Sequence, residues 1–165
     1  MKWLKTIAQN KIEQKSFRSD GEIYVALEHI ESWSGRLLHR DFDSKFDSQV
    51  KSFAAEDILF GKLRPYLAKV TRLDIGGVCV GELLVLRASE AMIDPTFLES
   101  RLRTSDFIEL VNSSTFGAKM PRADWGFIWK SPNCLSQLVE RATSNCFFCS
   151  GRHQSTVIGN RAREQ

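Results

Sequence analysis

The sequence predicts one α+β domain with a mixed, twisted sheet and short helices. Three observations support this. The 165 residues are 42% hydrophobic and 26% charged, which suits one globular domain with its own core. Short segments rich in β-branched and aromatic residues occupy much of the chain up to residue 88. Two helix-start patterns then follow each other directly between residues 94 and 113.

The first predicted element is a short amphipathic helix at residues 2–14, where apolar residues recur at helical spacing between lysines. Strands are then predicted wherever β-forming residues lie between polar connections such as residues 15–22 and 31–36. The predicted strands are 23–30, 67–73 and 78–88, and residues 58–60 begin like a buried strand. The segment 78–88, VCVGELLVLRA, is the clearest buried strand in the chain.

Two helices should follow the strands. Asp94 is a good N-cap and Pro95 suits the first helical position, which predicts a helix over residues 94–102. A Ser-Asp start predicts the second helix over residues 105–113. A loop containing glycine, proline and two cations occupies residues 114–125.

Residues 57–70, DILFGKLRPYLAKV, interrupt an apolar run with cations and a proline. Pro65 cannot donate a ladder hydrogen bond, and the preceding residue is expected to be extended. We therefore predict a bent, extended segment that apolar residues fix to the domain. The side chains that it presents are Lys62, Arg64, Tyr66 and Lys69. A charged edge strand that only improves solubility is the alternative.

The loop STFGAKMPRADW, residues 114–125, has a similar composition and suggests a second part of one binding face. Its candidate contacts are Ser114, Thr115, Lys119 and Arg122. Residues 1–125 contain 18 Lys+Arg and 18 Asp+Glu, so any anion-binding surface there must be a local cluster. The glycine-rich phosphate-loop and dinucleotide patterns are absent from the sequence.

An ordered series of motifs resembles a known family. The series is YVALEHIESWSGRL, FAAEDILFGKLRPYLAKV, GELLVLRA, DPTFLESRL and VNSSTFGAKMPRADW, over about residues 20–125. It resembles a target-recognition domain from the DNA-specificity subunit of type I restriction-modification systems.

This resemblance implies a non-catalytic module that reads one half of a split sequence in double-stranded DNA. It implies phosphate contacts from Lys62, Arg64 and Lys69, and base readout from variable loops such as 34–50 and 114–122. It also implies a partner methyltransferase that carries S-adenosylmethionine and a partner motor-nuclease that uses ATP and magnesium. The chain itself would need no cofactor.

Residues 126–165 depart from the family pattern and form an atypical tail after the domain at 1–125. The expected spacer helix is absent from the sequence pattern, and we expect either a disordered tail or a frameshift near residues 128–135. The alternative is a zinc site in a small phosphate- or metal-dependent enzyme. Its ligands would be Cys134, Cys146, Cys149 and His153.

Other residues give weaker indications of function. We expect His29, His39 and the pair Asp41/Asp43 to be structural or solvated, and Cys79 to be a small buried hydrophobe. No apolar run approaches the roughly 18 residues of a membrane span. The charged start does not suit a signal peptide, so we expect a cytoplasmic protein with reduced cysteines.

Overall fold

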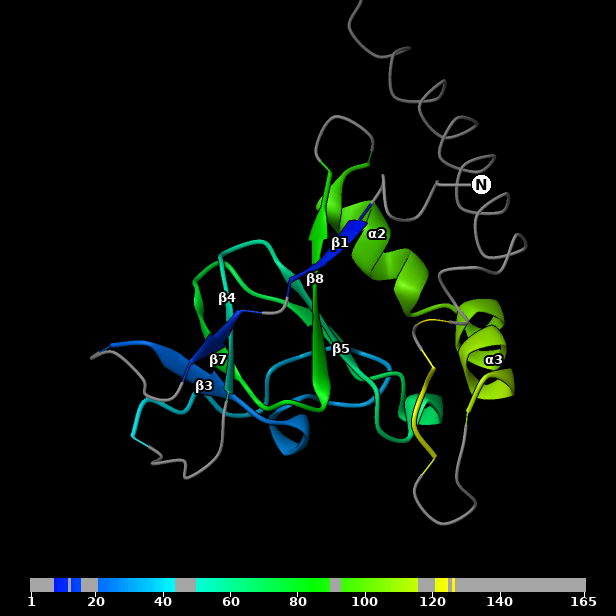
Figure 1. The fold of residues 1–165 in the computed structure, drawn as a ribbon, viewed down its shortest axis with the longest axis horizontal. Helices are drawn as coiled ribbons and strands as arrows, with labels where there is room; N and C mark the ends of the chain where they lie inside the picture. The colour runs from blue at the N-terminus through cyan, green and yellow to red at the C-terminus, as the bar shows by residue number, and fades with distance from the viewer. Residues whose placement is uncertain are drawn as a thin grey trace, which may run out of the picture.

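The computed structural model describes residues 8–11, 13–15, 21–43, 50–89, 93–115, 121–124 and 126. Within these residues the chain forms two four-stranded sheets and two α-helices (Figure 1), which confirms the predicted α+β class.

The first sheet is antiparallel throughout and has the strand order β1-β8-β5-β6. Its strands are β1 (Ala8–Lys11), β8 (Leu83–Ala88), β5 (Ile58–Gly61) and β6 (Val70–Arg72). In the register of the two central strands, Gly61 of β5 lies opposite Leu83 of β8. The end of β5 and the beginning of β8 therefore meet at the same edge, where the candidate site lies.

The second sheet has the order β2-β4-β7-β3 and is mixed, because β3 runs parallel to β7. Its strands are β2 (Gln14–Lys15), β4 (Val50–Phe53), β7 (Gly77–Cys79) and β3 (Ile23–Val25). The 3-10 helix η1 (Leu27–His29) follows β3.

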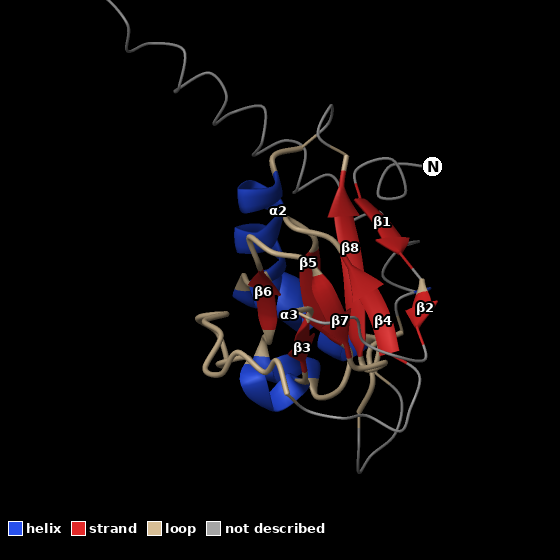
Figure 2. Ribbon diagram, turned by 90° about the vertical axis from the view of Figure 1, so that its left-hand side faces the viewer, coloured by secondary structure: helices blue, strands red, loops and turns tan. Residues whose placement is uncertain are grey.

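The helices α2 (Pro95–Leu102) and α3 (Ser105–Ser113) confirm both helix predictions. Asp94 caps α2, since its carboxylate accepts hydrogen bonds from the backbone N–H groups of Thr96 and Phe97. The helices pack on one face of the first sheet, where the rings of Phe60 and Phe107 meet edge to face at 5.9 Å. Figure 2 shows α2 beside this sheet.

The other face of the first sheet packs against the second sheet. Leu59, Leu83 and Val85 point to this side and contact a core that includes Ile23 and Val25. The central strands β5 and β8 are thus buried on both faces, which explains their nearly continuous apolar sequences.

Three sequence predictions of secondary structure were wrong. Residues 8–11 and 14 of the predicted N-terminal helix lie in strands, because β1 pairs with β8 and β2 pairs with β4. The predicted strand 78–88 is two strands in different sheets, with a turn at residues 81–82 between them. The predicted strand 23–30 ends at Val25 and continues as η1.

Candidate nucleic-acid interface

The two cationic segments predicted from the sequence lie side by side at the edge where β5 ends. The backbone N–H of Arg64 donates to the Pro121 carbonyl at 2.9 Å. The Ala123 N–H donates to the Lys62 carbonyl at 3.0 Å, and Leu63 pairs with Arg122 as an isolated antiparallel bridge. Residues 121–124 therefore act as a short added strand beside residues 62–64, near the lower end of β8 in Figure 1.

The segment after β5 is more sharply bent than the sequence predicted. Arg64 adopts a left-handed conformation with φ of 51°, and the 3-10 helix η2 (Pro65–Leu67) begins immediately after it. The prediction of an extended Arg64 was wrong, because tertiary hydrogen bonding of its N–H to Pro121 overrides the local preference before proline. As a result Arg64 is exposed and Tyr66 is 47% exposed.

Two of the predicted cations share one carboxylate. Arg122 forms an ion pair with Glu82 at 3.2 Å, and the Lys62 ammonium lies 4.0 Å from the other oxygen of the same carboxylate. The backbone N–H of Lys62 also donates to the Glu82 carbonyl at 2.9 Å. The turn between β7 and β8 is thus joined to both cationic segments.

A further lysine, Lys51 on β4, contacts this turn. Its ammonium donates to the carbonyls of Gly81 at 2.9 Å and Leu83 at 2.7 Å. Burial lowers the pKa of Lys51, and the nearby positive charge of Lys62 lowers it further. The position of Lys51 indicates a role in fixing the turn.

Sequence reasoning missed Lys51 and Glu82. Glu82 fell inside the segment that was predicted as one continuous strand, although the Gly81–Glu82 pair in an apolar run was a possible turn signal. Lys51 carried no signal, because its role depends on pairing between β4 and β7.

Several other side chains predicted to contact DNA donate hydrogen bonds to carbonyl groups within the protein. The Lys69 ammonium donates to the Leu27 carbonyl at 2.6 Å. The Ser114 hydroxyl is buried and donates to the Val111 carbonyl, and the Thr115 hydroxyl donates to the Asn112 carbonyl. These two hydroxyls satisfy carbonyl groups at the end of α3, so their DNA contacts stay predictions. The other predicted contact, Lys119, lies outside the described residues.

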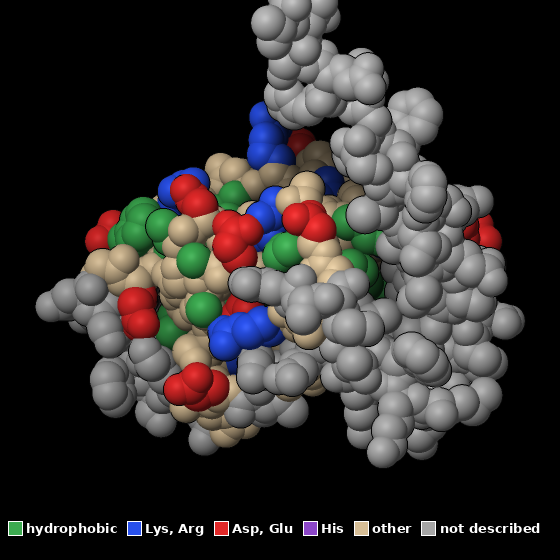
Figure 3. Space-filling model, turned by 90° about the horizontal axis from the view of Figure 1, so that it is seen from above, with side chains coloured by type: hydrophobic (Ala, Val, Ile, Leu, Met, Phe, Trp, Pro, Cys, Tyr) green, Lys and Arg blue, Asp and Glu red, His purple; other side chains and the backbone are tan. Residues whose placement is uncertain are grey.

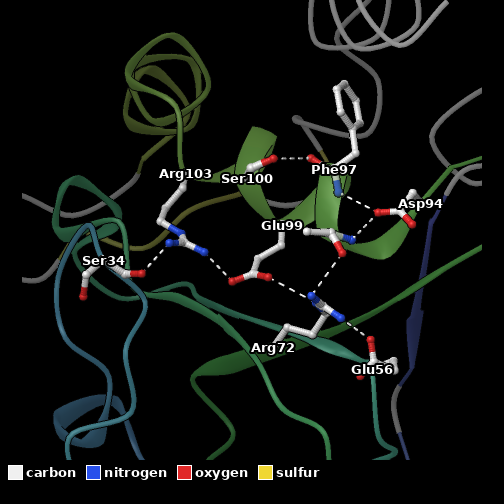
Figure 4. A network of polar contacts seen from close by, with 9 residues as sticks. Ser34, Glu56, Arg72, Asp94, Phe97, Glu99, Ser100 and Arg103 are labelled. Carbon is white, nitrogen blue, oxygen red and sulfur yellow. Dashed lines mark hydrogen bonds and ion pairs between the residues drawn. The ribbon is translucent and has the colours of Figure 1, made fainter. Parts of the chain in front are cut away.

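The loop after η1, part of the predicted base-reading segment 34–50, is bonded to the rest of the domain by a polar network (Figure 4). Arg103 bonds the backbone carbonyl of Ser34 and the carboxylate of Glu99. Glu99 also accepts from Arg72 at 3.1 Å, and Arg72 bonds Glu56. This network ties the loop to α2 and β6. Residues 44–49 lie outside the described part of the chain.

Charge elsewhere does not form one continuous basic surface on the face shown in Figure 3, where Lys and Arg side chains lie among acidic and apolar ones. This agrees with the balanced charge of residues 1–125.

The described residues give no support to a metal centre. Among them there is no group of three or more His, Cys, Asp or Glu side chains that could hold a metal ion. Cys79 is buried, as expected for a small hydrophobe, and burial raises the pKa of its thiol to about 12. The predicted zinc ligands and the tail at 126–165, apart from Gly126, lie outside the described residues. None of the described helices has the length and apolar character needed to cross a bilayer.

Comparison with known proteins adds a sequence match and two fold matches. No protein-family model matches the chain. The type I restriction enzyme EcoDI specificity subunit of Escherichia coli is 28% identical over 102 residues, which is 61% of this chain and 22% of that protein.

The fold matches are at lower sequence identity. The HsdS subunit from Thermoanaerobacter tengcongensis matches with a TM-score of 0.59 and 19% identity, over 88% of this chain and 40% of that one. A chain from a structure on complex assembly and conformational transition of the type I R-M system matches with a TM-score of 0.59 and 18% identity, over 86% and 44%. The chain thus spans less than half the length of each relative. Together the matches confirm the predicted resemblance to a target-recognition domain of a type I specificity subunit.

Proposed function

We propose that this chain binds double-stranded DNA and reads one half of a split recognition sequence as part of a type I restriction-modification complex. The observation that carries the proposal is the pairing of Leu63 with Arg122, which brings two distant cationic segments to one edge. The similarity to the Escherichia coli specificity subunit supports the same role.

In this proposal the edge binds the DNA backbone and the neighbouring loops read the bases. Lys62, Arg64 and Arg122 bind phosphates, because arginine and lysine donors suit phosphate oxygens. Tyr66 is exposed beside them and contacts the sugar-phosphate backbone or a base. Phosphate contacts orient the domain, while base readout falls to the exposed loops.

We further propose that the chain has no catalytic role of its own and works with a methyltransferase subunit and a motor-nuclease subunit. The similarity to specificity subunits supports this division of labour. S-adenosylmethionine, ATP and magnesium would then belong to the partners. We propose a cytoplasmic location, where the DNA and these partners would be.

The test is a DNA titration at several salt concentrations. Fluorescence anisotropy of a labelled mixed-sequence duplex gives the association constant at each salt concentration. The logarithm of this constant should fall linearly with the logarithm of the salt concentration, with a slope of about −0.9 for each phosphate contact. Single-stranded DNA of the same length serves as the comparison. Equal affinity for both forms, or binding that salt does not change, would contradict the proposal.

Variants of the cationic edge sharpen the test. Lys62→Ala and Arg122→Ala should each weaken binding to every duplex by a similar factor and reduce the salt slope by about one. A target duplex can be selected from a randomised pool. Both variants should bind this duplex more tightly than a mixed-sequence duplex, by the same ratio as the wild type. Unchanged affinity and slope would remove these residues from the interface.

A further inference from the structure

The carboxylate of Glu82 lies between two cations of the proposed DNA-binding edge. One oxygen accepts from the Arg122 guanidinium at 3.2 Å and 3.3 Å. The other oxygen accepts from the same guanidinium at 3.4 Å and lies 4.0 Å from the Lys62 ammonium. These cations come from segments about sixty residues apart in the chain, and Glu82 belongs to a third segment. The carboxylate therefore occupies the place where an external anion would meet both cations.

The backbone around Glu82 is fixed without help from this carboxylate. Lys51 bonds the carbonyls on both sides of it, at Gly81 and Leu83. The Glu82 carbonyl accepts from the Lys62 N–H, and the β5–β8 ladder begins at the next residue. The side chain can therefore release the cations while the turn keeps its position.

We propose that Glu82 is an internal competitor for DNA phosphate at Lys62 and Arg122, an inference that rests on the function proposed above. A carboxylate and a phosphate offer similar oxygen acceptors to a guanidinium. The side chains of Glu82 and Arg122 are 31% and 51% exposed, so their ion pair is accessible and weak enough for a phosphate to displace. Glu82 thereby lowers the affinity of this edge for DNA of any sequence.

The competing explanation is that Glu82 positions the two cations for DNA. The two explanations predict effects of opposite sign. A competitor that is removed strengthens DNA binding, whereas a positioning residue that is removed weakens it.

The decisive variant is Glu82→Gln, which keeps the shape of the side chain and the backbone hydrogen bonds. At low salt it should bind a mixed-sequence duplex about two- to tenfold more tightly, the range expected from releasing exposed ion pairs. The salt slope should steepen by about 0.9, because the net charge of the three side chains rises from +1 to +2. The tightening should be equal for target and non-target duplexes.

Glu109→Gln is the matched control, since it removes the same charge from an exposed position on α3. A general effect of net charge would tighten binding equally in both variants. A second control repeats Glu82→Gln in a Lys62→Ala/Arg122→Ala background, where its effect should fall to that of Glu109→Gln. Circular dichroism confirms that each variant is folded.

Each outcome decides the inference. Tighter binding by Glu82→Gln alone, lost in the background without the two cations, supports it. Weaker binding, binding equal to the Glu109→Gln control, or an effect that persists without the cations overturns it while leaving the proposed function intact. If neither wild type nor Glu82→Gln binds duplex DNA, the proposed function and the inference fail together.

Discussion

The ion pair between Asp57 and Arg87 gives the sharpest stability prediction, because its two members differ in burial. The Asp57 side chain is 1% exposed, whereas that of Arg87 is 47% exposed. Both carboxylate oxygens accept from the guanidinium at 2.7 Å, and one also accepts from the Ala54 N–H at 2.8 Å. The cost of breaking the pair should therefore depend on which partner is removed.

Arg87→Met keeps an apolar stem but leaves a buried carboxylate with one backbone donor. Removing one partner in this way should cost about 3–5 kcal/mol of unfolding free energy. Asp57→Asn keeps an acceptor for Ala54 and leaves Arg87 able to reach solvent, so we expect a loss of about 1–2 kcal/mol. The double variant should be more stable than Arg87→Met alone, because the unpaired buried charge is gone.

The assay is urea unfolding of wild type and the three variants at neutral pH, followed by far-ultraviolet circular dichroism. With a slope of about 2 kcal/mol per molar urea, Arg87→Met should lower the midpoint by about 2 M and Asp57→Asn by less than about 1 M. An equal loss in both single variants would refute the argument from burial. So would a double variant less stable than Arg87→Met.

Three further predictions concern single residues. The hydrogen bond from the Phe97 backbone N–H lowers the pKa of Asp94. The contribution of Asp94 to stability should therefore be full at neutral pH and be lost as the pH falls below about 3.8. Asp94→Asn should reduce the fall of the thermal unfolding midpoint at acid pH. Gly35→Ala should destabilise the protein by at least about 3 kcal/mol, because the new Cβ would lie 2.0 Å from a β6 carbonyl oxygen. Gly21→Ala has open space around the new Cβ, so it should cost only about 1 kcal/mol for its positive φ. The urea midpoints of the two variants test this difference. The Cys79 thiol, whose pKa is about 12, should resist iodoacetamide at pH near 8 in the folded protein and react after unfolding, as peptide mass spectrometry would report.

The sequence predicted the parts of the fold that depend on local interactions. Asp94 and Pro95 place the start of α2 through capping and backbone preference. The Ser-Asp pair at residues 105–106 marks the first turn of α3, and both helix predictions are confirmed. The apolar runs of β5 and the C-terminal half of residues 78–88 predicted buried strands, because burial on both faces requires continuous hydrophobicity. The sequence also predicted several lysines and arginines of the candidate site, because two short segments concentrate them.

Only the tertiary structure decided how these parts meet. The pairing of Leu63 with Arg122, the left-handed Arg64 and the strand character of residues 8–11 all depend on backbone partners distant in the chain. Local preference cannot encode such partners, because non-local hydrogen bonds form only once the register of the sheets is set. For the same physical reason, the sequence predicted the cations of a binding edge but not the position of Glu82. Glu82 lies between two of these cations only in the folded chain.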